Sequence, residues 1–254
     1  MLYLIAFIFG SIWGSFSNVC IHRIPDGISV VTGRSHCPSC KTEIKWYDNI
    51  PLFSYLFLKA KCRGCSAKIN IKYFLVELIS AINFVVIFHF FGVSLTTLLF
   101  FILSICFVII FFIDLKHFII PNELTYPLMI IGLLKSFDPN LNTTLFPNLV
   151  NSLIGGLFGY IIIWLIIFTY KKLRNKEGMG LGDAKLLSVI GFWFGWASIP
   201  FVIFFSSVIA LLSVVPDIIK NKKDLSSQIP FGPYLIIGNL VFLIFNEQIR
   251  LFLN

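Results

Sequence analysis

Two aspartates lie where the sequence changes between polar and strongly apolar, and their type and position could support acid–base chemistry. Asp183 follows the glycine-rich stretch Gly178–Gly182 and precedes the apolar run Leu186–Phe205. Asp114 ends another apolar run, Leu95–Ile113. Ionisable side chains at the edge of a hydrocarbon layer are costly, so each aspartate is a candidate functional residue.

Two carboxyl groups that lie close together in a poorly solvated site can share one proton, because they cannot both ionise easily. One then activates a water molecule while the other protonates the leaving group, which is the chemistry of aspartic proteases. Sequence spacing alone does not show that Asp114 and Asp183 meet. The alternative is that each ends or caps its own helix, with Asp183 as an N-cap, and the sequence leaves both interpretations open.

Four cysteines form two Cys-x-x-Cys pairs in the one long polar section of the chain, residues 22–72. Each pair supplies two sulfurs from a tight turn, and zinc takes a tetrahedral arrangement, so two such pairs predict a four-thiolate zinc site. The alternative, two disulfides, requires an oxidising compartment. The positive charge of the section favours the cytoplasm and therefore zinc. The candidate ligands are Cys37, Cys40, Cys62 and Cys65.

The composition predicts the elements that must position these groups. Hydrophobic residues make up 57% of the 254 residues and charged residues only 13%, whereas ordinary soluble domains carry about 25% charged residues. The mean hydropathy is +0.90. The net charge of +8 is confined to a few loops, so membrane topology explains it better than nucleic-acid binding does. We therefore expect an all-α polytopic membrane protein.

Eight apolar runs are candidate transmembrane helices, and two of them, Leu124–Leu134 and Leu186–Trp196, are short enough to need residues from their polar flanks. Together with these two, the runs are Leu2–Val19, Tyr73–Phe91, Leu95–Ile113, Leu149–Phe168, Phe201–Val215 and Phe231–Phe252.

The basic residues give these helices an orientation. With residues 22–72 placed inside, Lys135 and Arg250 are the two of the 20 Lys and Arg that fall outside, which agrees with the positive-inside rule. Both termini are then outside, and both aspartates lie at the cytoplasmic end of their helices. The predicted organisation is a first transmembrane helix at 1–21, a cytoplasmic zinc-binding loop at 22–72 and a transmembrane catalytic core at 73–254.

Several motifs together resemble the type IV prepilin peptidases, the GxGD-type membrane aspartic proteases of bacterial pilus and type II secretion systems. The resemblance runs nearly end to end. It is carried by the two Cys-x-x-Cys pairs and by five segments, Gly14–Val19 with Arg23–Pro25, Trp46–Pro51, Ile113–Asn122, Lys176–Leu186 and Pro230–Pro233.

The resemblance implies that Asp114 and Asp183 are the catalytic pair. It also implies an enzyme of the bacterial inner membrane that cuts the short basic leaders of prepilins or pseudopilins on the cytoplasmic side, after a glycine. Many members then methylate the new N-terminal residue with S-adenosylmethionine. This chain departs from the usual pattern at Asn122, where the family often has Asp, and at Ala60, where it usually has a glycine associated with methylation.

Carboxylates near the inner face are candidates for recognising the lysines of a basic leader, while the apolar pilin helix stays in the bilayer. Glu77 has an alternative interpretation as the ion-pair partner of Lys72, and Glu177 as a solvated loop charge. The four candidates are Glu43, Asp48, Glu77 and Glu177.

Three other functions share some of these sequence features. A presenilin-like intramembrane protease shares GxGD, but it normally carries a Pro-Ala-Leu motif that this sequence lacks and has no such cysteine loop. A small-molecule transporter often shows two related halves, which this sequence does not show. A non-enzymatic assembly scaffold would recruit partners through the zinc loop, and it would tolerate Asn at positions 114 and 183.

Overall fold

The structure is a computed structural model that describes residues 1–141, 145–175, 178–219 and 228–253. These residues are predominantly helical and contain no strand, only two isolated bridges in the cysteine loop. The chain divides into two compact units, Met1–Ile109 and Ile110–Asn254, and each is considered by itself. The division falls inside one helix, so it differs from the predicted division at residues 21 and 72, which follows the membrane and stays a prediction.

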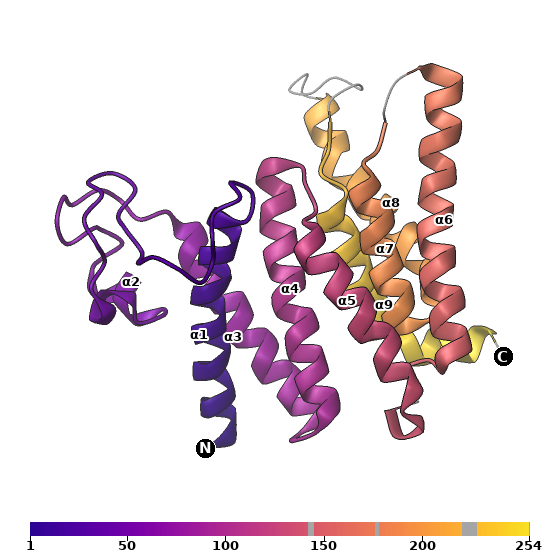
Figure 1. The fold of residues 1–254 in the computed structure, drawn as a ribbon, viewed down its shortest axis with the longest axis horizontal. Coiled ribbons are helices and arrows are strands. Elements are labelled where there is room, and N and C mark those ends of the chain that lie inside the picture. The colour runs from indigo at the N-terminus through magenta and orange to yellow at the C-terminus, as the bar shows by residue number, and fades with distance from the viewer. Residues whose placement is uncertain (142–144, 176–177, 220–227, 254) are drawn as a thin grey trace. The chain divides into compact units, whose positions relative to one another are not determined.

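In the first unit α1 (Leu2–Arg23) packs along α3 (Ile71–Phe91), as Figure 1 shows. Small residues let the two backbones approach closely. A Cβ atom on Gly10 would lie 2.8 Å from the Cα of Ala81, and one on Gly14 would lie 2.7 Å from the Cα of Glu77. Close packing is therefore the role of the small residues in α1.

The cysteine loop joins α1 to α3 and holds only short helices, the 3-10 turn Trp46–Asn49 and α2 (Phe53–Phe57). Arg23, the last residue of α1, folds the start of the loop back over the helix end. Its guanidinium donates hydrogen bonds to four main-chain carbonyl oxygens, those of Ser29, Thr32, Gly33 and Arg34.

In the second unit α7 (Leu181–Phe194) is the central helix, and most of its side chains are buried. It contacts each of the four other helices that lie wholly in this unit (Figure 1). These are α5 (Asn122–Leu134), α6 (Leu149–Arg174), α8 (Ser198–Ile219) and α9 (Gly232–Leu253).

Backbone contact holds α6 against α7. A Cβ atom on Gly191 would lie 2.1 Å from the carbonyl oxygen of Gly155, so neither helix could carry a larger residue there without moving. Two serine hydroxyls cross the same interface. Ser188 donates to the carbonyl of Gly156 at 2.8 Å, and Ser152 donates to the carbonyl of Phe192 at 2.7 Å. These contacts fix the helix that carries Asp183.

Lys135, predicted as a charge in an outer loop, is buried just beyond the end of α5. Its ammonium group has no hydrogen-bond partner among the described residues, and it lies 4.2 Å from the ring centre of Phe146 and 5.9 Å from that of Trp193. Burial lowers the pKa of Lys135 to about 7. Aromatic rings thus take the place of water around this charge, a feature that its predicted position outside the membrane does not show.

The eight predicted apolar runs coincide with eight of the helices, α1 and α3–α9. Among the described residues, five of these are long and apolar enough to cross a membrane, namely α1, α3, α4 (Leu95–His117), α6 and α8. The helices α5 and α7 are short, as predicted, with 13 and 14 residues. The fold is thus an all-helical, multi-pass membrane protein, while the number of eight crossings stays a prediction.

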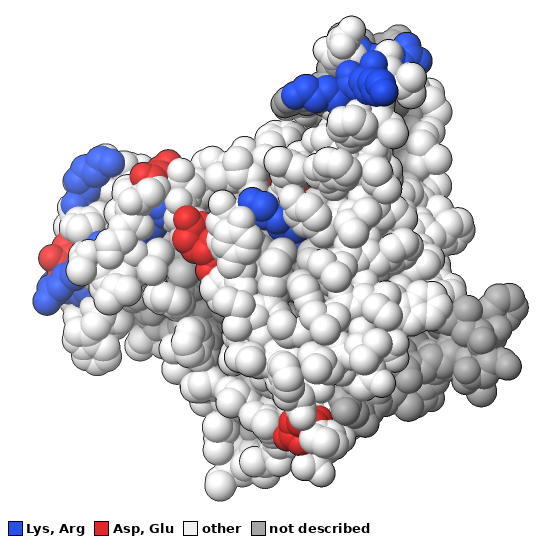
Figure 2. Space-filling view, turned by 45° about the vertical axis from the view of Figure 1, so that its right-hand side comes forward, with Lys and Arg blue, Asp and Glu red and all other residues white. Residues whose placement is uncertain are grey.

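The surface agrees with a membrane location. Figure 2 shows wide stretches of the drawn face that carry neither blue nor red side chains. Large apolar side chains are exposed along the flanks of the long helices, for example Ile12 on α1 and Leu157 on α6. In a lipid environment such side chains contact acyl chains rather than water.

Candidate active site and metal centre

Asp114 lies in the last turn of α4, with 4% of its surface exposed. Its Oδ2 accepts a hydrogen bond of 3.0 Å from the main-chain N–H of Gly232. Gly232 is the first residue of α9, and the first N–H groups of a helix have no partner within it. The partial positive charge of that helix end therefore stabilises a negative charge on Asp114.

A side chain at position 232 would break this contact. A Cβ atom there would lie 2.7 Å from Oδ2 of Asp114 and 3.0 Å from Cδ1 of Ile120. Pro233 follows in the first turn of the helix, where a missing N–H costs nothing. The motif Pro230–Pro233, to which the sequence assigned no role, thus holds Asp114 in place.

Asp183 lies in the first turn of α7, and its side chain is buried. The N-cap residue of this helix is Gly180, and the main-chain N–H of Asp183 donates to its carbonyl at 3.2 Å. The alternative in which Asp183 is the N-cap is therefore wrong. The carboxyl group instead accepts a hydrogen bond from the main chain of Gly180.

The structure brings the two aspartates together at neighbouring helix ends in the second unit. Ile120 lies between their glycine neighbours, because a Cβ atom on Gly182 would lie 2.9 Å from its Cβ and one on Gly232 would lie 3.0 Å from its Cδ1. The negative charge of Asp114 acts electrostatically on Asp183. The two carboxyl groups therefore lie close enough to influence each other's charge, which favours a pair over two independent helix ends.

A cross-link between α7 and α5 lies next to this pair. The ammonium group of Lys185 donates to Oδ1 of Asn122 at 2.7 Å and lies 5.3 Å from the ring centre of Tyr126. Asn122 is the first residue of α5. The cross-link ties the start of the helix that carries Asp183 to the segment that follows Asp114.

The four cysteines of the loop form one cluster, with all sulfurs within 4.8 Å of one another. The Sγ atoms of Cys37 and Cys65 are 3.9 Å apart, and those of Cys40 and Cys62 are 4.0 Å apart. None of these cysteines forms a disulfide. Tetrahedral zinc with bonds of about 2.3 Å places its sulfurs about 3.8 Å apart. The cluster can therefore hold a metal ion. Its members are Cys37, Cys40, Cys62 and Cys65.

The two halves of the cluster are built alike. Cys37 donates its N–H to the carbonyl of Thr42, and Cys62 donates to that of Ala67, both at 2.9 Å. The residue after each second cysteine, Lys41 or Ser66, has a positive φ of 58° or 59°. The turns aim N–H groups at the sulfurs.

Hydrogen bonds prepare the first pair for metal binding. The hydroxyl and N–H of Thr42 lower the pKa of Cys40 to about 6. The N–H groups of Cys40 and Ser39 lower the pKa of Cys37. A lower pKa favours the thiolate, which is the form that binds a metal.

Comparison with known proteins finds relatives that match the chain over most of its length. Residues 8–91 match the bacterial peptidase A24 N-terminal domain, and residues 101–215 match the type IV leader peptidase family. A protein from Aeromonas hydrophila is 35% identical, over 96% of this chain and 91% of its own length. One from Pseudomonas aeruginosa is 34% identical, over 94% and 89%. Both are named prepilin leader peptidase/N-methyltransferase.

The chain belongs to the type IV leader peptidase family. No solved structure matches it significantly. The family resemblance given by the motifs is thus confirmed, and the presenilin-like, transporter and scaffold alternatives lose their support.

Three residues that position the pair in this leader peptidase were not predicted as such, namely Ile120, Lys185 and Gly232. Each lies in a segment that carried the family resemblance, so the motifs were the available signal. Their roles depend on contacts between residues far apart in the sequence, and no local pattern shows those contacts.

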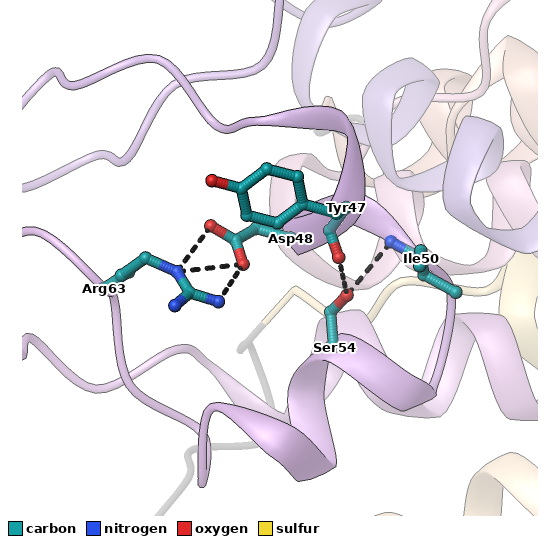
Figure 3. A network of polar contacts seen from close by, with 5 residues as sticks. All are labelled: Tyr47, Asp48, Ile50, Ser54 and Arg63. Atoms are coloured by element: carbon teal, nitrogen blue, oxygen red, sulfur yellow. Dashed lines mark hydrogen bonds and ion pairs between the residues drawn. The ribbon is translucent and has the colours of Figure 1, made fainter.

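The carboxylates predicted to recognise the leader have partners of their own. Glu43 forms an ion pair with Arg34, and Asp48 accepts hydrogen bonds from Arg63, the shortest at 2.6 Å (Figure 3). Glu77 accepts the N–H of Leu52 at 2.8 Å rather than pairing with a lysine. Glu177 lies outside the described residues. Their role in recognition stays a prediction.

Proposed function

We propose that this leader peptidase cuts the basic leaders of type IV prepilins or pseudopilins after a glycine, with Asp114 and Asp183 as its catalytic pair. The observation that carries the proposal is the buried pair of aspartates at the ends of α4 and α7, with the N–H of Gly232 directed at only one of them. The family membership supplies the substrate class.

The unequal surroundings assign different roles to the two groups. We assign Asp114 as the base, because the N–H of Gly232 at the start of α9 stabilises its charged form, and Asp183 as the group that holds the proton. A water molecule attacks the glycine carbonyl carbon and gives a proton to Asp114, while Asp183 protonates the carbonyl oxygen. As the C–N bond breaks, Asp114 passes its proton to the leaving nitrogen, and a hydroxyl of the intermediate returns one to Asp183.

Two substitutions test this assignment. Asp114→Asn and Asp183→Asn keep the side-chain size but cannot exchange a proton, so each should lower the cleavage rate at least ~100-fold. The measurement is the mass of a leader-bearing prepilin before and after incubation with the purified enzyme. Glu123→Gln, at an exposed carboxylate in the first turn of α5, is the matched control and should cleave normally. Near-normal cleavage by either Asn variant would remove the dyad.

Methylation of the new N-terminus is the second proposed activity, because the relatives are named N-methyltransferases as well. The methyl donor, S-adenosylmethionine, carries a positive sulfonium group. A groove of about 330 Å³ between α5, α6 and α7 does not suit that cation, because its one charged lining residue is Lys185. No step of methyl transfer is therefore assigned to this groove.

Zinc is the metal we propose for the cysteine cluster, since four thiolates in tight turns form a closed tetrahedral site. Such a site is structural, so the ion joins the two turns and takes no part in hydrolysis. The positive-inside rule supports a cytoplasmic position for the loop and for the ends of α4 and α7 in a bacterial inner membrane.

We also propose that Glu43, Asp48, Glu77 and Glu177 attract the lysines of the leader. Attraction between charges is screened by salt, so cleavage of a lysine-rich leader should weaken as ionic strength rises. Charge reversal should raise KM for a basic leader more than it lowers kcat. Equal, unchanged kinetics for basic and neutral leaders in all four variants would move recognition to the apolar segment or the cleavage-site backbone.

A further inference from the structure

One segment of the cysteine loop, residues 46–57, exposes large apolar side chains. The exposed fractions are 81% for Trp46, 60% for Phe53, 63% for Leu56 and 83% for Phe57. Single exposed apolar residues are ordinary, but several in one short segment indicate an interaction surface. We call residues 46–57 the aromatic segment.

Contacts with α3 show where this segment lies. The N–H of Leu52 donates to Oε2 of Glu77 at 2.8 Å, and the ring of Tyr55 packs against that of Phe74 with centroids 5.1 Å apart. Glu77 comes six residues after Ile71, the first residue of α3, so it lies about 9 Å along the helix. The aromatic segment therefore folds back beside the first two turns of a membrane-spanning helix.

Further contacts stabilise the packing of the aromatic segment against α3. Glu77 also interacts with the hydroxyl of Ser15 on α1, so one carboxylate joins the segment to both helices. Leu52, whose N–H it accepts, is itself buried. The segment uses Leu52 and Tyr55 to hold the helix pair, which leaves the exposed side chains of Phe53 and Phe57 pointing elsewhere.

Internal hydrogen bonds give the segment a fixed shape. The hydroxyl of Ser54 donates to the carbonyl of Tyr47 and accepts the N–H of Ile50, both at 3.0 Å (Figure 3). Asp48 is held by Arg63, which lies between the third and fourth cysteines. The position of the aromatic segment is thereby linked to the second cysteine pair.

The charges next to the segment complement a lipid surface. Lys45 precedes Trp46, and Lys59 and Lys61 follow α2, all of them exposed. Trp and Phe with neighbouring lysines are typical of segments that lie in the membrane–water interface, where lysines meet anionic headgroups.

We propose that the aromatic segment lies in the interfacial layer of the bilayer, at the end of α1 and α3 that carries the cysteine loop. Trp46, Phe53 and Phe57 enter the boundary between headgroups and acyl chains, and the flanking lysines contact lipid phosphates. The loop is then not a free polar excursion. Its cysteine cluster is held beside the membrane surface through Arg63 and Asp48, whatever the substrate of the enzyme.

Trp46 is a natural probe of this placement. The purified protein is placed in nanodiscs of phosphatidylethanolamine and phosphatidylglycerol, with or without bromine at carbons 6 and 7 of the acyl chains. The fluorescence of Trp46 is obtained as the difference between the wild type and Trp46→Phe, which keeps the other tryptophans. We expect brominated lipid to quench this difference signal by more than half, and acrylamide in the water to quench it weakly.

One double substitution and one single control test the surface itself. Phe53→Ser with Phe57→Ser should abolish the lipid quenching of Trp46 and increase quenching by acrylamide. The matched control is Val31→Ser, because Val31 is 86% exposed in the same loop but lies outside the aromatic segment. That control should leave both signals unchanged.

Other occupants of the surface would give other results. A Trp46 signal that acrylamide quenches fully and brominated lipid does not would overturn the proposal. Shielding that appears only after a prepilin is added would assign the surface to protein, and would overturn it as well. Metal content of one ion per chain in every variant shows that the loop remains folded.

Discussion

The cysteine loop and the aspartate pair are held in place by opposite means. The loop depends on short turns, exposed ion pairs and a cluster of sulfurs that can take a metal, and it has few buried residues of its own. The aspartates lie at helix ends within a tightly packed unit, where α7 is buried on almost all sides. No metal ligand set among the described residues lies in that second unit.

The two regions are therefore sensitive to different kinds of substitution. A loop held together by a metal ion unfolds when its ligands are removed, because it has little hydrophobic core of its own. A site built on helix packing is lost when a backbone contact is blocked, even if every charged group remains. Substitutions in one region should therefore leave the other region folded.

The largest effect should come from Gly232→Ala, which disturbs the aspartate pair and should lower the rate of prepilin cleavage. The added Cβ would lie 2.7 Å from Oδ2 of Asp114 and displace it from the N–H of α9. We expect kcat for prepilin cleavage to fall about 100-fold, as for loss of a proton-transfer group. The matched control is Gly64→Ala in the loop, where a Cβ atom has 3.8 Å to its nearest neighbour. Full activity of Gly232→Ala would contradict this role.

Removing cysteines should instead unfold the cysteine loop. Cys37→Ser with Cys62→Ser takes one ligand from each turn, so metal content should fall from one ion to none per chain. Hydrogen exchange should then become faster in the turns that start at Cys37 and Cys62. Amides of α6 and α7 should keep their protection, because their contacts lie in the helix-packed unit. Loss of protection in both places would show that the regions are not independent.

A smaller effect is expected at Lys135, where the helix-packed unit contains a poorly placed charge. The unfolded chain binds a proton at this amine up to about pH 10.5, while the folded pKa is about 7. Stability should therefore rise with pH between about 7 and 10.5, by at most ~1.4 kcal/mol per unit, and less because two rings favour the cation.

Lys135→Met is the matched variant for this effect. It should stabilise the protein at pH 7 and remove this part of the pH dependence. The measurement is thermal unfolding in lipid nanodiscs at pH 7 and pH 9, compared between the two proteins. An equal change of Tm with pH in both would show that Lys135 does not titrate in this range.

The smallest effect should be in the loop, at Ala60. Its φ of 56° lies in the left-handed region, which glycine adopts without steric cost. Ala60→Gly should stabilise the loop by about 0.5–1 kcal/mol, seen as slower hydrogen exchange in the turns. Ala67→Gly, at a position without positive φ, should not do so. Methylation measured on the same variants tests whether the family's glycine acts through this backbone.

The sequence predicted most of the helices and the grouping of the four loop cysteines. Long apolar runs strongly predict membrane helices, and two Cys-x-x-Cys pairs strongly predict that the four cysteines cluster around one metal ion. The role of Gly232 could not be predicted, because it lies 118 residues from Asp114. The burial of Lys135 could not be predicted either, because a positive-inside count uses only the loop in which a lysine falls.

Glu77 shows the same limit at short range. Its expected partner was the nearest lysine in the sequence, whereas the structure gives it the N–H of Leu52. A main-chain donor from a loop has no signature in the side-chain sequence. Contacts of this kind decide the arrangement of the loop, and only the folded chain shows them.

Because α7 is short, the thickness of the lipid layer affects how far Asp183 lies from the membrane surface. Its 14 residues span about 21 Å, against about 30 Å for the hydrocarbon core. Trp196, just beyond its far end, is of the type that settles at a membrane interface. If that end is fixed there, the start of α7 lies about 9 Å short of the opposite surface and Asp183 about 12 Å short, so the bilayer must thin or water must enter. Hydrolysis consumes water, so a short helix that leaves room for water beside Asp183 would suit this reaction. Longer acyl chains would then increase the distance between Asp183 and the nearer surface.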